Sequence, residues 1–228
     1  MHDPHFDRSA SRRPLGRGRS ALLALSLLAP LLGTSCSSPM PLPTVQDVDL
    51  ERFMGDWFVL AHVPASIERK AYNAVESYAL RDDGKVATTY VFRKGGFDGP
   101  LKEYRPVGTV RDRETNATWD MQFLWPFQAE YLIVELDEEY SVTIIGRSKL
   151  DYVWVMARTP EIGPERWEAL EAKLVELGYD LTKLRRVPHQ WPDADHPVQA
   201  RMDAAEADRV DRSATRSSAS PTSSQSTS

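Results

Sequence analysis

The sequence predicts an all-β fold, namely an eight-stranded antiparallel up-and-down β-barrel with one C-terminal amphipathic α-helix packed against its outside. Three observations predict it. Apolar-rich or alternating runs of strand length follow one another through the middle of the chain. Short turn signals separate these runs, which favours antiparallel neighbours. A single helical repeat follows the last run, and one helix is too little for a second core.

The predicted strands come in an unbroken series. They are residues 57–63, 75–80, 86–92, 104–110, 117–124, 131–136, 141–145 and 152–158. The Asp83-Gly84 pair between the second and third runs is a strong hairpin signal. Glycines and a proline within 95–100 and polar residues within 112–116 mark the next two turns. Eight such strands can close into a barrel.

The predicted helix lies between Gly163-Pro164 and Gly178. Proline is tolerated in the first turn of a helix, and glycine is a common C-terminal cap. Between them, large apolar residues recur at helical spacing and form one stripe: Trp167, Leu170, Leu174 and Leu177. We expect this stripe to pack on the outside of the barrel.

The N-terminus is predicted to be an export signal. An arginine cluster precedes an almost wholly apolar run at 21–32, and small residues then lead to Cys36, the one cysteine of the chain. The apolar run is shorter than the ~20 residues that span a bilayer. The alternative is a buried core helix, but the run has no polar face. A single cysteine also excludes an internal disulfide.

Cys36 resembles the lipidated cysteine of bacterial lipoproteins. Thr34 and Ser35 fit the small residues of such a cleavage site, whereas Gly33 stands where leucine is usual. The resemblance implies a signal peptide over 1–35, and Ser37 after the cysteine implies the outer membrane. Alternating prolines favour an extended tether, so residues 36–46 are interpreted as lipidated cysteine plus tether. Plain secretion or a free thiol remain alternatives.

The chain after the barrel is predicted to lack a packed core. Residues 213–228 are half serine, and 193–212 carry charges and alanines with few large apolar side chains. Such segments bury too little surface to offset their ordering entropy. We therefore expect 192–228 to be a disordered Ser-rich tail, with a fraying helix as the alternative for 193–212. The folded domain is then 47–191.

One predicted strand carries the clearest candidate site. Trp119, Met121, Phe123 and Trp125 occupy alternate positions, so in a strand their side chains point to one face. That face is either ordinary core or the wall of a ligand cavity, and inside a small barrel the two overlap. Further aromatic residues that could join it are Phe127 at the rim and Tyr78, Tyr90 and Phe92 on neighbouring strands.

Four short motifs in order resemble the lipocalin family, in particular the bacterial outer-membrane lipoprotein type that is similar to apolipoprotein D. They are Gly55-x-Trp57, Trp125-Pro126-Phe127, Leu136-Asp137-Glu138-Glu139-Tyr140, and Asp151-Tyr152-Val153-Trp154 leading to Ala157-Arg158-Thr159-Pro160. The first motif alone is weak, and the set in order is strong. The structural signature residues are therefore Gly55, Trp57, Asp137, Tyr140 and Arg158.

The resemblance implies roles as well as a fold. It implies that Trp57 plugs one end of the barrel and that Arg158 lies across its indole. Such a cation–π interaction contributes ~0.5–2 kcal/mol. It also implies binding, storage or transport of small amphipathic molecules such as fatty acids or lysophospholipids. The protein would be anchored through Cys36 to the outer membrane, and we expect it on the periplasmic face of that membrane. Charged residues such as Arg93, Lys94, Lys102 and Arg105 are head-group candidates, with surface solvation as the default.

Other functions have less support in the sequence. Isomerising members of the family use a cysteine inside the barrel, and residues 47–191 contain none. His62, His189 and His196 have no metal-ligand spacing, so no metal and no cofactor is predicted, although His62 is the one internal candidate for a haem ligand. The sequence contains no stripe of basic residues interleaved with aromatic ones, so no binding of nucleic acid is predicted. The alternatives kept open are an enzyme on this fold and an interaction module or homodimer that uses the loops at 95–100 and 126–127.

Overall fold

The computed structural model describes residues 42–64 and 68–218. The expected signal peptide and Cys36 lie outside these residues. The strands are β1 Gly55–Val63, β2 Ala71–Leu80, β3 Val86–Lys94, β4 Leu101–Tyr104, β5 Val107–Val110, β6 Thr118–Leu124, β7 Phe127–Leu136, β8 Val142–Gly146, β9 Val153–Ala157 and β10 Arg185–Arg186. The helices are α1 Leu50–Phe53, α2 Pro164–Glu176, the 3₁₀ turn η1 Leu181–Lys183 and α3 Gln199–Ser218.

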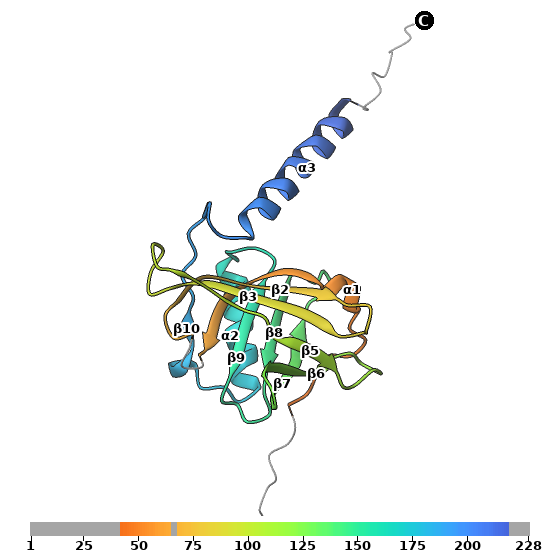
Figure 1. The fold of residues 1–228 in the computed structure, drawn as a ribbon, viewed down its shortest axis with the longest axis vertical. Coiled ribbons are helices and arrows are strands. Elements are labelled where there is room, and N and C mark those ends of the chain that lie inside the picture. Colours follow the sequence, from red (N-terminus) through yellow and green to blue (C-terminus); the bar gives the residue numbers. More distant parts are fainter. Residues whose placement is uncertain (1–41, 65–67, 219–228) are drawn as a thin grey trace, which may run out of the picture. The chain divides into compact units, whose positions relative to one another are not determined.

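The strands form the closed antiparallel barrel that the sequence predicts (Figure 1). Strands that are neighbours in the barrel pair antiparallel, β1 closes the ring by pairing with β9, and the short β10 pairs with the end of β1. The predicted strand 104–110 is in fact two pieces, β4 and β5, which both pair with β3. Pro106 lies between them and has no N–H to donate to a ladder, which explains the break. Strands β1 to β9 therefore fill eight barrel positions.

Two apolar layers follow from the alternation of each strand. Inside the barrel lie Trp57, Val59, Tyr90 and other buried residues of one cluster. Outside, Phe58 and Leu60 belong to a second cluster, which the apolar stripe of α2 completes with Leu170 and Leu174. The helix thus covers the outer face of the sheet, as expected. In the part of the chain that the structure describes, no helix is long and apolar enough to cross a bilayer.

Two β-bulges change which residues face the interior. The ladder between β1 and β9 shifts between Val59 and Ala61, so that His62 lies opposite Trp154, an interior residue. Residues directly opposite across a ladder share a face, and His62 therefore faces inward. A second shift in β2, between Tyr72 and Val75, sets the phase in which Glu76 faces the interior.

The segment after the barrel differs from the expected disordered tail. Asp193 and His196 are buried against the barrel, and α3 begins at Gln199. Arg201, in the first turn of α3, donates two hydrogen bonds of 2.7 Å to the Asp56 carboxylate. Charged and polar contacts order residues 193–201. An expectation based only on the scarcity of large apolar side chains does not detect such contacts.

Candidate functional site

Aromatic side chains seal one end of the barrel, which we call the closed end. Phe53 packs on Trp57 with ring centroids 5.2 Å apart and meets Trp119 edge-on at 5.5 Å. All three are fully buried. The indole N–H of Trp57 donates to the Phe53 carbonyl at 2.9 Å. Trp57 therefore lies at the closed end, packed between Phe53 and the barrel wall.

Arg158 binds the outer side of this plug. Its guanidinium carbon lies 3.8 Å from the centre of the Trp57 ring. The guanidinium also donates to the carbonyls of Asp56 at 2.9 Å and Tyr140 at 3.2 Å. Burial lowers the pKa of Arg158 to about 10, so the group stays charged at neutral pH. Gly55 has φ +93°, and a Cβ there would lie 3.3 Å from this guanidinium, which explains the glycine.

The remaining signature residues order the turn between β7 and β8. Asp137 accepts hydrogen bonds from the amides of Ser141 and Val142. Burial alone would raise the pKa of Asp137, but these hydrogen bonds lower it overall. The Tyr140 hydroxyl accepts from the Asp49 amide at 2.8 Å. These contacts are structural, and they join the turn to the segment that crosses the closed end.

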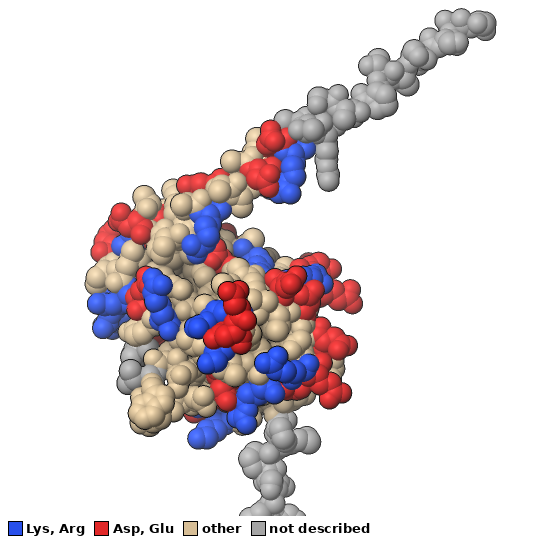
Figure 2. Space-filling model, turned by 45° about the vertical axis from the view of Figure 1, so that its right-hand side comes forward, with Lys and Arg blue, Asp and Glu red and all other residues tan. Residues whose placement is uncertain are grey.

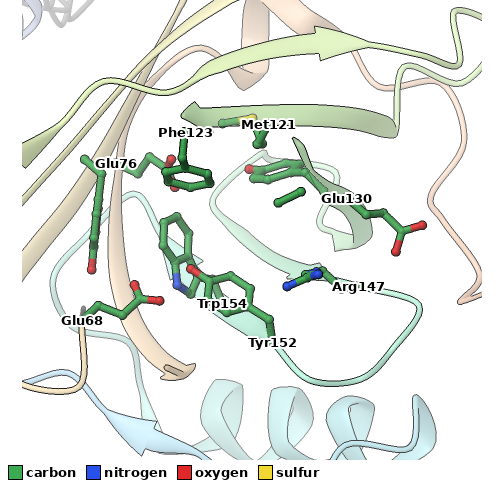
Figure 3. A pocket seen from close by; sticks show the side chains of 11 residues that line it. Glu68, Glu76, Met121, Phe123, Glu130, Arg147, Tyr152 and Trp154 are labelled. Carbon is green, nitrogen blue, oxygen red and sulfur yellow. The ribbon is translucent and has the colours of Figure 1, made fainter. Parts of the chain in front are cut away.

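A cavity of about 230 Å³ occupies the other half of the barrel (Figure 3). It is reached from the end opposite the plug, where the lining residues Phe123 and Glu130 are exposed. We call this the open end. The side chains that line the cavity are Glu68, Glu76, Tyr90, Met121, Phe123, Ala129, Glu130, Tyr131, Arg147, Tyr152 and Trp154. Five of these eleven residues are aromatic, three carry a carboxyl group and one carries a guanidinium.

The buried acids give the cavity its electrostatic character. Glu76 is only 1 % exposed, and neither of its carboxyl oxygens has a hydrogen-bonding partner in the described part of the protein. Burial raises the pKa of Glu76 well above its usual range; the nearby Tyr78 hydroxyl opposes this rise, and the negative charge of Glu68 adds to it. Glu68 lies 3.6 Å from Nδ1 of His62. Burial also raises the pKa values of Tyr90 and Tyr152, again with a contribution from Glu68.

The structure divides the predicted lining residues into three groups. Tyr90, Met121 and Phe123 line the cavity. Trp119, Tyr78 and Phe92 are buried but pack in the core: Trp119 stacks on Tyr131, Tyr78 contacts Phe53, and Phe92 stacks on Tyr104. Trp125 and Phe127 are 82 % and 73 % exposed at the rim of the open end. The predicted lining residues are therefore spread along the barrel, from buried core positions near the closed end, through the cavity wall, to exposed positions at the rim. Which of them touch a ligand remains a prediction.

Sequence reasoning missed the polar part of the lining. Glu76 lies between Ala74 and Tyr78, two positions from each, and all three face the interior. The alternation is visible in the sequence, but the bulge in β2 decides which of the two alternating sets of side chains faces the interior. In the sequence, Tyr152 and Trp154 stand out only as part of a family motif, and Arg147 and Glu68 lie outside the predicted strands.

The remaining surface offers mixed charge. On the face drawn in Figure 2, acidic and basic side chains are interspersed. Such mixing favours solubility more than steering of a partner of one sign. Among residues 42–64 and 68–218, no group of three or more His, Cys, Asp or Glu side chains is arranged to hold a metal ion.

Comparison with known proteins gives consistent matches. A family model described as a lipocalin-like domain matches residues 48–189. The outer membrane lipoprotein Blc of Escherichia coli is 29 % identical over 166 residues, covering 71 % of this chain and 92 % of Blc. Apolipoprotein D of Macaca fascicularis is 27 % identical, covering 72 % of this chain and 92 % of that protein.

A solved structure agrees with the observed architecture. Insecticyanin from the tobacco hornworm Manduca sexta superposes with a TM-score of 0.54 at 14 % identity, covering 69 % of this chain and 88 % of insecticyanin. At this identity the likeness concerns the fold alone.

Proposed function

The chain belongs to the lipocalin-like family, and on that premise we propose that it binds a small amphipathic molecule in the barrel cavity. The finer proposal is that this ligand is a fatty acid or lysophospholipid, which the protein stores or carries at the bacterial envelope. We propose no catalytic role for the cavity.

The observation that carries the proposal is the cavity itself. A barrel of eight strands can be filled by its own side chains or can hold one small ligand. Here the interior is filled at the closed end and keeps about 230 Å³ at the open end. Apolar cavities of about 150 Å³ already admit benzene. The volume suits a ring or a short chain segment, with the rest of a longer ligand at the mouth.

The mouth has features suited to the outer part of an amphiphile. The rim aromatics Trp125 and Phe127 offer apolar contact to a chain. Arg147 lines the cavity, and its Nη1 lies 3.5 Å from Asp151. A guanidinium in this position can bind a carboxylate or phosphate that remains near solvent.

The proposed location follows from the N-terminal sequence and the relatives. Several relatives carry the name outer membrane lipoprotein, which agrees with lipidation at Cys36. An acyl anchor would keep the cavity beside a membrane that supplies lipids. Each buried methylene of such an anchor contributes ~0.8 kcal/mol to membrane affinity.

A cavity-filling variant tests the binding proposal. Ala129 lines the cavity, so Ala129→Phe adds a ring inside it, whereas Ala129→Ser at the same position adds little volume. We expect palmitate and lysophospholipid to bind the parent and the serine variant, and Ala129→Phe to lose at least about tenfold in affinity. Calorimetric titration measures this, together with mass spectrometry of lipid extracted from protein purified from its envelope. Absence of both lipid binding and extractable lipid would overturn the proposal.

A further inference from the structure

The inner part of the cavity carries more polar chemistry than an apolar ligand requires. Beside Glu76, three further buried polar groups that line it have no hydrogen-bonding partner in the described residues, namely the Trp154 indole N–H, the Tyr90 hydroxyl and the Nε–H of Arg147. A buried polar group left unpaired costs ~1–3 kcal/mol. Four such groups around one cavity indicate a ligand with a polar or charged end.

The charges nearest Glu76 favour a cation as that end. Figure 3 shows Glu68 and Glu76 on one side of the cavity and Arg147 on the opposite side. Arg147 already has Asp151 as a partner at 3.5 Å, and His62 lies beside Glu68 at 3.6 Å. Glu76 forms no ion pair within 42–64 and 68–218, although it is buried. An anionic group at this depth would meet two carboxyl groups.

Aromatic rings form the wall next to the acids. The rings of Tyr90 and Trp154 have centroids 4.9 Å apart at an interplanar angle of 37°. Those of Tyr152 and Trp154 are 5.5 Å apart at 48°. Aromatic faces attract cations, most strongly when water is excluded, and such walls recognise ammonium groups.

We propose that the inner end of the cavity binds a protonated amine or quaternary ammonium group, with Glu76 as its anionic partner and the rings of Tyr90, Tyr152 and Trp154 as its walls. This inference rests on the proposed function, because it assigns the ligand class of the same cavity. It ranks cationic amphiphiles above fatty acids of equal chain length.

Binding of a cation should release a proton from Glu76. The titratable and charged groups around this end are His62, Glu68, Glu76, Tyr78, Tyr90, Tyr131, Arg147, Tyr152 and Arg185. Burial raises the pKa of Glu76, so without a bound cation its neutral acid form is favoured. A bound ammonium favours the carboxylate instead. Affinity for the cation therefore rises with pH, by up to about tenfold per pH unit below the Glu76 pKa.

The test compares three probes of equal chain length on the full purified protein: octylammonium, octanol and octanoate. We expect calorimetry to give octylammonium at least about a tenfold tighter Kd than the other two at about pH 8. That preference should shrink toward about pH 6, while octanol affinity stays constant. If octanol binds as tightly as octylammonium, the inference is wrong and the proposed function stands. If none of the probes binds, both fail.

Two variants assign the effect to one residue. Glu76→Gln keeps the shape and removes the charge, so octylammonium should bind it no better than octanol and without pH dependence. Glu114→Gln makes the same change on an exposed turn at the closed end and should leave all three affinities unchanged. An unaltered octylammonium affinity in Glu76→Gln would overturn the inference. Should that variant fail to fold, the parent's selectivity and pH slope still decide.

Discussion

Arg158 joins three separate segments at the closed end. Its hydrogen bonds reach the carbonyls of α1, β1 and the turn between β7 and β8, while its charge lies over the Trp57 ring. Hydrogen bonds that involve a charged donor are about twice as strong as neutral ones. The planar fork of arginine suits these acceptors, to which the Arg52 carbonyl adds a fourth at 2.7 Å, better than a lysine ammonium would. One side chain therefore ties the plug to the ring around it.

Loss of the plug residue should destabilise the whole barrel. We expect Trp57→Ala to lower the free energy of unfolding by ~3–5 kcal/mol, because it removes a fully buried indole and the partner of Arg158. Urea melts followed by circular dichroism measure the change. Trp125→Ala is the matched control, since this tryptophan is 82 % exposed and should change stability by less than ~0.5 kcal/mol. Similar melts for both variants would contradict the assigned roles.

Helix α2 has one face buried against the barrel and one face exposed to solvent, and neighbouring residues lie on different faces. Leu174 is fully buried against the outer face of the barrel, whereas Val175 is 58 % exposed. We expect Leu174→Ala to cost ~2–5 kcal/mol and Val175→Ala less than ~0.5 kcal/mol. Thermal and urea denaturation of the two variants check this. Equal effects would mean that the helix contributes little to the fold.

The segment 192–198 is held to the barrel by buried polar groups. Arg93 donates to both oxygens of the Asp193 carboxylate at 2.6 and 2.7 Å, and Asn73 adds a bond of 2.9 Å. These bonds lower the pKa of Asp193 to about 2. Its contribution to stability is therefore complete above about pH 4 and is lost only toward pH 2. This pairing gives the segment a fixed position.

Two histidines should make the same region sensitive to milder acid. Burial lowers the pKa of His189 to about 4 and lowers that of His196 as well. Because free imidazoles titrate near 6.5, the unfolded segment binds more protons between about pH 6.5 and pH 4. We expect amide protection at 193–198 to fall across this window, after correction for intrinsic exchange, while β1–β3 amides change less. Hydrogen exchange measured at about pH 6.5 and about pH 4 tests this. Equal protection of the 193–198 amides at the two pH values would refute it.

At the scale of the whole molecule, local patterns predicted the architecture but not the interior chemistry. Turn signals and alternation gave the strand order, and the helical stripe gave α2. The phases of β1 and β2 depend on bulges near Val59 and Tyr72, which become visible only once the paired strands are known. For that reason the sequence alone does not place Glu76 in the interior. The strand alternation also ends at Leu124, the last residue of β6, and Trp125 lies exposed beyond it.

The plug at one end of the barrel has a kinetic consequence. In the part of the chain that the structure describes, the cavity meets solvent near Phe123, and the opposite end is sealed by fully buried rings. A ligand of the proposed kind would then enter and leave through the same opening. Substitutions that narrow or widen this opening without touching the bound ligand should change the association and dissociation rates together and leave the equilibrium constant nearly unchanged, whereas substitutions at the inner wall should act mainly on the dissociation rate.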